Sequence, residues 1–184
     1  MSDSDAFIIS AAKDVQPAEA MRQAIQNAGV HLSRVQDVIF GLDEPRSVDI
    51  VKIMGDAGLA CPTATVSSSL HAIFFAAQSI LSGDVDVLIV IGIESNSSTA
   101  FLLASPDAVG RWNLMPCARL AVRSLSGIDP ALRTAELTSS DVTIVKDGKQ
   151  GVLLIKELLE ELEQKSGRWG MAVMNELTLL IERI

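Results

Sequence analysis

The chain has few aromatic residues and few of the side chains that most often do nucleophilic or acid–base chemistry. Its 184 residues include 5 Phe, 2 Trp, no Tyr, 2 His and 2 Cys, so the core must be built mainly from aliphatic side chains. Cys61 and Cys117 lie far apart and lack metal-ligand spacing. They predict free thiols in a reducing compartment, hence a cytoplasmic protein, and no bound metal.

Clusters of basic residues and long apolar segments are absent as well. The formal net charge is −8, which argues against a nucleic-acid partner because binding phosphates requires clustered Lys and Arg. No apolar run approaches 18 residues, so no membrane span is expected, and the acidic residues 1–5 do not resemble a signal peptide. A hydrophobic fraction of 48% and a mean hydropathy of +0.33 favour an oligomer.

Strands and helices alternate along the chain, which predicts a layered α/β domain. Residues 95–113 interrupt this alternation and predict a loop with at most one helical turn. Strands are expected at residues 6–11, 35–40, 62–66, 85–91, 114–126, 141–145, 171–174 and 177–181. Helices are expected at residues 17–27, 47–57, 68–81, 150–165 and from about residue 131.

An internal repeat supports a duplicated βαβ architecture. Residues 24–41 align without gaps to residues 131–148, and six of the eighteen positions are identical. Each copy spans the end of a helix, a turn and a strand. One copy per half of the chain favours duplication over chance similarity.

The segment from Thr63 to Ile73 has the pattern of a nucleophile elbow. It predicts a buried strand, a tight turn and the start of an apolar helix. The position at which such an elbow carries its nucleophile is Val66. Valine can neither attack a carbonyl nor transfer a proton, so its chemistry excludes a catalytic role.

Several segments resemble the thiolase family, in order along nearly the whole chain. Residues 7–12 and 35–41 resemble the first two thiolase strands, and residues 69–87 resemble the helix after the nucleophile. Residues 92–97, with the sequence Gly-Ile-Glu-Ser-Asn-Ser, are similar to the family's Gly-Gly-Met-Glu-Ser-Met-Ser. The elbow also resembles the Ala-Cys-Ser-Ser-Ser-Leu elbow of the related ketosynthases. Residues 118–130 and 158–172 resemble the second thiolase half.

The resemblance implies a reduced, truncated version of the layered α/β/α thiolase fold, with two unequal βαβ-type halves in one compact domain. It implies an N-terminal half at 1–98, a shortened loop region at 99–115 and a truncated C-terminal half at 116–184. It also implies a relation to acyl-CoA acyltransferases of fatty-acid or polyketide metabolism.

The chain departs from thiolases at each catalytic position. Val66 stands at the position of the nucleophilic cysteine, and Asn175 at that of the second reactive cysteine. The Asn-Glu-Ala-Phe and Gly-His-Pro segments, the latter with the histidine that activates the cysteine, are missing where residues 146–150 lead directly into the last helix.

Other residues could in principle replace the missing groups. Ser67 and Cys61 are alternative nucleophiles, but serines at 67–69 are better explained as helix caps, and cysteines like Cys61 and Cys117 as buried small hydrophobes. His71 follows Ser67 by one helical turn, whereas His31 is expected in an exposed turn. Glu94 is more readily a structural group than an acid–base catalyst, and the start of the helix at 68–81 is the best candidate for binding an anion.

We therefore expect a non-catalytic thiolase-like subunit. The resemblance implies pairing through Pro62–Val66, either in a homodimer or in a hetero-oligomer with a catalytic thiolase-like protein. The alternative is a weak acyltransferase that uses Ser67 or Cys61, and only this alternative calls for a CoA thioester. No other cofactor is expected.

Overall fold

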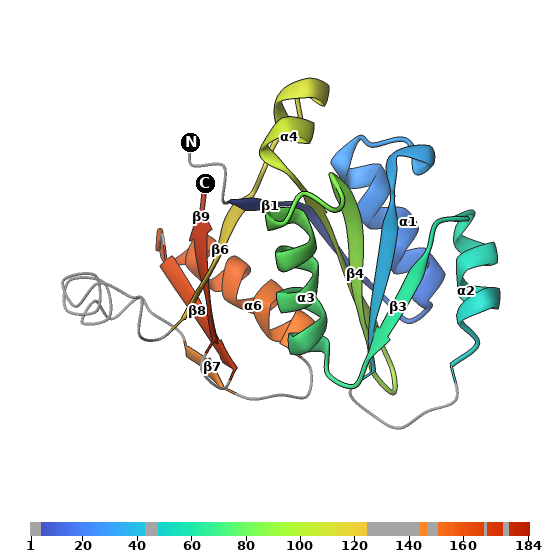
Figure 1. Ribbon diagram of the computed structural model, residues 1–184. Helices are drawn as coiled ribbons and strands as arrows, with labels where there is room; N and C mark the ends of the chain where they lie inside the picture. The colour runs from blue at the N-terminus through green and yellow to red at the C-terminus, as the bar shows by residue number, and fades with distance from the viewer. Residues whose placement is uncertain (1–4, 43–47, 125–143, 147–150, 168, 175–176) are drawn as a thin grey trace.

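The computed structural model describes residues 5–42, 48–124, 144–146, 151–167, 169–174 and 177–184. Within them, one mixed sheet has nine strands in the order β3-β2-β4-β5-β1-β6-β9-β8-β7 (Figure 1). The strands are β1 (Ala6–Asp14), β2 (Asp37–Leu42), β3 (Thr63–Val66), β4 (Val87–Ile93), β5 (Ser98–Ala104), β6 (Ala118–Ser124), β7 (Ile144–Lys146), β8 (Trp169–Met174) and β9 (Leu177–Arg183). The helices are α1 (Pro17–Ala28), η1 (Leu32–Arg34), α2 (Ile50–Ala57), α3 (Ser69–Leu81), α4 (Pro106–Trp112) and α6 (Gly151–Gln164).

The sheet consists of two similar halves that meet at β1 and β6. In the first half β2 and β4 are parallel, and β5 is antiparallel to both β4 and β1. In the second half β7 and β8 are parallel, and β9 is antiparallel to both β8 and β6. The antiparallel pair β1/β6 joins the halves. The aligned repeat places β2 and β7 in equivalent positions, as a duplicated architecture requires.

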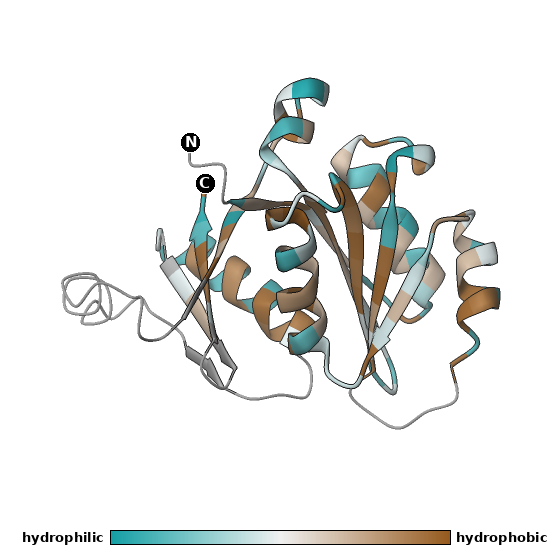
Figure 2. Cartoon of the chain, in the orientation of Figure 1, coloured by the Kyte–Doolittle hydropathy of each residue, from teal (hydrophilic) through white to brown (hydrophobic). Residues whose placement is uncertain are grey.

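Helices cover the sheet on both faces, and two apolar clusters fill the space between the layers. One cluster joins α3 and α6 to one face and includes Phe74, Phe101 and Ile155. The other joins α1, α2 and α4 to the opposite face of the first half and includes Met21 and Phe40. Every residue of β4 and β5 is buried, which agrees with their strongly apolar colouring (Figure 2). The chain is thus a layered α/β fold, as its sequence predicts.

Local sequence signals explain where several helices begin and end. Pro17 opens α1 at its first position, and Gly29 closes the helix with a left-handed φ of 67°. Gly58 closes α2 in the same way, with a φ of 76°. In α3 the buried residues recur at helical spacing, which fixes the face that packs against the sheet.

The predicted loop region is the main error in the sequence-based assignment. The 95–113 segment, counted as loop at 99–115 in the domain division, instead contains the central strand β5 and the helix α4. The first residues of β5, Ser98 and Thr99, are polar and therefore suggested a loop, although both are buried between β4 and β1. The Ser105 hydroxyl accepts the Ala108 N–H at 3.1 Å and caps α4, whose first residue is a proline.

Other predicted elements are confirmed with small shifts at their ends. The predicted strand at 114–126 is β6, the predicted helix at 150–165 is α6, and the last two strands pair as the antiparallel β8 and β9. The turn at 127–130 and the helix expected from residue 131 lie outside the described residues. The division into halves at 1–98 and 116–184 stays an interpretation.

Candidate functional site

The elbow joins β3, the edge strand of the sheet, to α3. The prediction of a buried strand is wrong for β3, because this strand lies at the end of the sheet. Thr63 and Thr65 are exposed, whereas Ala64 and Val66 are half-buried and pack against the apolar cluster around α3. Val66, which the resemblance places at the nucleophile position, therefore adds apolar contacts to the core.

The three serines after Val66 have three different environments. Ser67 is exposed. Ser68 is the N-cap of α3, and its hydroxyl accepts the His71 N–H at 3.4 Å. Ser69 is fully buried, and its hydroxyl accepts the Val152 N–H of α6 at 3.2 Å. The capping interpretation is confirmed for Ser68, while Ser69 links two helices.

Three glycines allow the elbow to pack against its neighbours at very short range. A Cβ on Gly41 of β2 would lie 2.4 Å from the Ser69 Cα, and one on Gly92 of β4 would lie 3.0 Å from the Ser69 Cβ. A Cβ on Gly151 would lie 2.5 Å from the Leu70 Cα. The first turn of α6 is therefore seated directly on the first turn of α3, and both rest on the sheet.

Among the described residues, neither histidine ring forms a hydrogen bond with a residue of the elbow. His71 is exposed on α3 and contributes its main-chain N–H to the Ser68 cap. His31 caps η1 at the amino end of β2, with Nδ1 2.8 Å from the Ser33 hydroxyl oxygen. Because β2 and β3 are parallel, the carboxyl end of β3 lies about 13 Å or more along the sheet from His31. The structure does not bring His31 to the elbow.

Neither thiol lies at the elbow. Cys61 precedes β3, five residues before Val66 and thus about 16 Å away along an extended chain. Burial raises the pKa of the Cys61 thiol, and Asp37 adds to this effect. Cys117 is exposed and borders a surface hollow, so the expectation of a buried cysteine is wrong for this residue. Nearby atoms still desolvate its thiol and, with a contribution from Glu163, raise its pKa to about 11. Thiols of this kind stay protonated near neutral pH and are weak nucleophiles.

Glu94 is the predicted polar residue that does lie at the same edge of the sheet as the elbow. It directly follows β4, which is parallel to β2 and β3. Its main-chain N–H donates to the Ser97 carbonyl at 2.9 Å and closes the turn into β5. Asn175, which the resemblance places at the position of the second family cysteine, lies outside the described residues.

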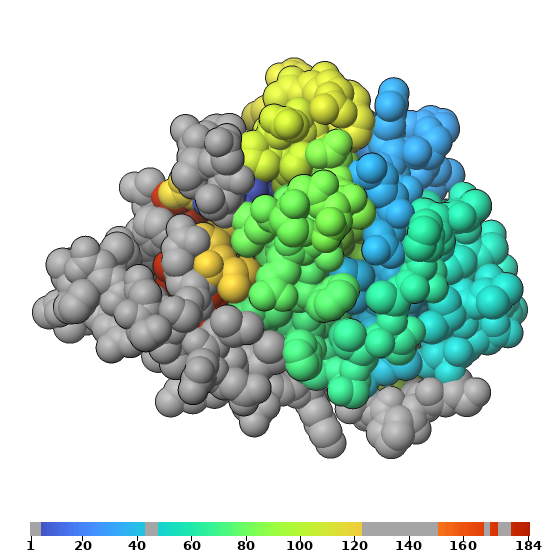
Figure 3. Space-filling model, in the orientation of Figure 1, coloured from blue at the N-terminus to red at the C-terminus, as the bar shows by residue number. Residues whose placement is uncertain are grey.

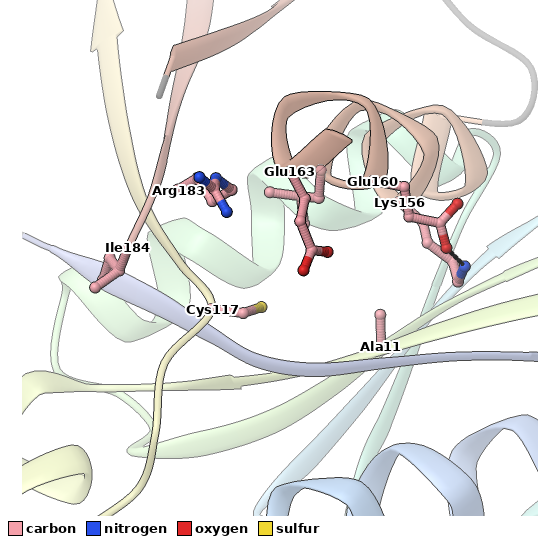
Figure 4. Close-up of a pocket in the computed structure, with 8 residues that line it drawn as sticks. Ala11, Cys117, Lys156, Glu160, Glu163, Arg183 and Ile184 are labelled. Atoms are coloured by element: carbon pink, nitrogen blue, oxygen red, sulfur yellow. Dashed lines mark hydrogen bonds and ion pairs between the residues drawn. The ribbon is translucent and has the colours of Figure 1, made fainter. Parts of the chain in front are cut away.

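The structure also shows a hollow that the sequence did not indicate. Lys156, Glu160 and Glu163 of α6 line this hollow together with Cys117 and Arg183 (Figure 4). Only the packing of α6 against distant strands brings these residues together, so no local signal could have revealed it.

The described residues contain neither a metal site nor a helix that could span a membrane. No cluster of three or more His, Cys, Asp and Glu side chains in this part of the chain is arranged to hold a metal ion. No helix among the described residues has the length and apolar character to cross a membrane.

Comparison with known proteins agrees with the fold. The thiolase N-terminal domain model matches residues 10–111. The beta-ketothiolase BktB of Cupriavidus necator is 39% identical over 114 residues, which cover 54% of this chain and 28% of that protein. The chain thus spans little more than a quarter of that relative's length.

A solved structure with the same fold is human mitochondrial 3-ketoacyl-CoA thiolase in complex with CoA. The two structures superpose with a TM-score of 0.76 at 13% sequence identity, and the superposition covers 98% of this chain and 98% of the human chain. This likeness concerns the fold alone. Because the N-terminal domain match extends over more than half of the residues and includes the elbow, the chain belongs to the thiolase family.

Proposed function

We propose that this protein is a non-catalytic thiolase-like subunit that pairs with a second copy of itself or with a catalytic thiolase-like protein. The observation that carries the proposal is Val66, which occupies the nucleophile position of the elbow and packs into the core. A cytoplasmic location, predicted from two cysteines that are free in the structure, belongs to the same proposal.

The chemistry of acyl transfer supports the loss of catalysis. The reaction needs a nucleophile, a base that accepts its proton, and donors for the oxyanion that develops. Val66 supplies no nucleophile. The hydroxyl of Ser69 is buried and accepts a hydrogen bond from the Val152 N–H of α6. The elbow therefore contributes to the packing of α3 and α6 and has no group suited to attack an acyl carbonyl at Val66 or Ser69.

The edge strand β3 supports the pairing role. The Val38 N–H donates to the Pro62 carbonyl at 3.1 Å, and Val38 is the ladder partner of Thr63. Because main-chain groups point alternately to the two sides of a strand, the N–H groups of Thr63 and Thr65 face the open edge. The threonine side chains are exposed and β-branched, as suits a strand that receives another strand.

The surface next to β3 has further features of an interface. Phe75 of α3 is 47% exposed, and His71 is exposed one turn before it. Figure 3 shows α3 and the neighbouring β3 region on one face of the molecule. A large aromatic side chain at the surface of a protein that has only seven aromatics favours contact with a partner.

A second candidate function is weak acyl transfer from a CoA thioester. The observation that favours it is the exposed Ser67, which lies beside the amino end of α3, where main-chain N–H groups concentrate. Cys61 is a poorer candidate because it lies at the other end of β3 and burial raises its pKa.

The two functions are separated by incubation with acetyl-CoA followed by intact-mass measurement and by an assay of thiolysis and condensation. The pairing proposal predicts no acetyl adduct and no CoA release above the uncatalysed rate. An adduct that disappears in Ser67→Ala would favour the acyltransferase, whereas an adduct that persists in this variant would assign the acetylation to another residue.

A further inference from the structure

The hollow beside α6 is separate from the elbow. It has a volume of about 300 Å³ and lies between α6, the strand β1 and the segment that leads into β6 (Figure 4). It extends along the second half of α6 to Glu163, which is about 16 Å along the helix from Val152 at the elbow. The volume is at the lower end of the range for pockets that bind small molecules.

Of the four charged side chains that line this hollow, two form an ion pair with each other and two form none with any described residue. The Lys156 ammonium and the Glu160 carboxylate form an ion pair with each other. Arg183 donates from Nε to the Gly167 carbonyl at 3.1 Å, which holds the guanidinium in place. Among the described residues, neither Arg183 nor Glu163 forms an ion pair.

The unpaired charges have opposite signs and come from facing elements. Arg183 belongs to β9 and Glu163 to α6, and in Figure 4 their side chains lie on adjoining sides of the hollow. The lining as a whole carries two cations and two anions, so it favours neither a simple anion nor a simple cation. A ligand that satisfies both Arg183 and Glu163 must carry both charges itself.

We propose that the hollow binds a small zwitterion of amino-acid size, with its acid group on the Arg183 guanidinium and its ammonium group on the Glu163 carboxylate. Leu159 provides an apolar wall for the methylene groups between the two charges. This site is independent of acyl transfer and of pairing through β3.

Cys117 provides a direct reporter of occupancy. Its thiol donates to the Ile8 carbonyl with a sulfur–oxygen distance of 3.3 Å and borders the hollow. In a Cys61→Ser background it is the only cysteine, so a ligand in the hollow must slow its labelling by a thiol reagent.

The test uses glycine, β-alanine and 4-aminobutanoate, which separate their two charges by increasing lengths, with acetate and methylammonium as single-charge controls. Binding is measured by NMR titration of the full chain and by Cys117 labelling. We expect saturable binding of at least one zwitterion, with neither single-charge control binding comparably. Glu163→Gln and Arg183→Gln should each weaken it by about tenfold or more, because each removes a charged hydrogen-bond partner.

Lys165→Gln is the matched control, since Lys165 pairs with Glu161 on the same helix and does not line the hollow. It should leave the affinity unchanged, and thermal melts establish that all three variants are folded. No saturable binding of any zwitterion up to about 50 mM would overturn the proposal. Equal binding of acetate or methylammonium, or affinities unchanged in both hollow variants, would also overturn it.

Discussion

Val66 is the residue at which loss of chemistry can be tested most simply. Val66→Cys places a thiol at the nucleophile position of the elbow and changes the packing little. We expect no thiolysis or condensation above the wild-type background, because a thiol needs a base in contact with it, and His71, the nearest histidine in sequence among the described residues, is exposed on α3 and contributes its main-chain N–H to the Ser68 cap. The measurement is CoA release from acetoacetyl-CoA and acetyl-CoA. Turnover by Val66→Cys would show that the other catalytic groups are present and that valine alone prevents the reaction.

The two native thiols give a second prediction at this scale, based on pH. Desolvation raises the pKa of both, and that of Cys117 to about 11. A thiol with a pKa of about 11 has about one thiolate per thousand molecules at pH 8, whereas an ordinary cysteine has about a quarter. Labelling of Cys117 by iodoacetamide in Cys61→Ser should therefore be slow at pH 8 and should rise steadily to about pH 11.

The unfolded protein, labelled in denaturant, is the control for this experiment. Its labelling rate should level off near pH 9 instead. A plateau near pH 9 in the folded protein as well would contradict the assigned environment of Cys117.

The functional candidates at the residue scale were only partly predictable. The position of Val66 and the capping role of Ser68 follow from the local pattern of strand, turn and helix. The burial of Ser69 does not, because it depends on Gly41, Gly92 and the start of α6, which are distant in sequence. The grouping of Cys117, Glu163 and Arg183 around one hollow depends on long-range packing in the same way.

At the scale of elements, the contact between β2, β4, α3 and α6 depends on glycines. Gly41→Ala would place a Cβ 2.4 Å from the Ser69 Cα, and this backbone cannot move aside without shifting the helix. We expect a loss of about 1–3 kcal/mol or more in the free energy of unfolding, measured by urea denaturation.

Gly55→Ala in α2 is the control, because nothing lies within 4 Å of its Cβ position. It should stabilise the protein by about 0.5–1 kcal/mol through higher helix propensity. Equal effects of the two substitutions would contradict the close packing at Ser69.

Elements with a strong local pattern were predicted well. The apolar periodicity of α3 and the aliphatic run of β4 identified both, and Pro17 and Gly29 located the ends of α1. β5 was missed because its polar first residues, Ser98 and Thr99, are buried by strands on both sides, a property that no local window contains.

At the scale of the whole molecule, the two similar halves of the described chain share one continuous sheet. The repeat in the sequence indicated two related units but not that β1 and β6 pair with each other, since that register involves residues more than 100 positions apart. The continuous sheet has β3 at one end, and no other described strand pairs with its outer edge. This edge is where we propose that a second thiolase-like chain attaches.

The most direct test of this account is the mass of the assembly formed by the wild type and by Thr65→Pro, measured by native mass spectrometry and sedimentation equilibrium. Thr65 has its N–H on the open side of β3, so proline removes no hydrogen bond to β2 but blocks strand addition. Thr65→Val keeps the N–H and is the matched control.

We predict a dimer of the wild type and of Thr65→Val, or a complex of both with a full-length thiolase of the same organism, and a folded monomer for Thr65→Pro that forms neither. A wild type that stays monomeric and does not bind that thiolase, or an assembly that persists in Thr65→Pro, would contradict the account.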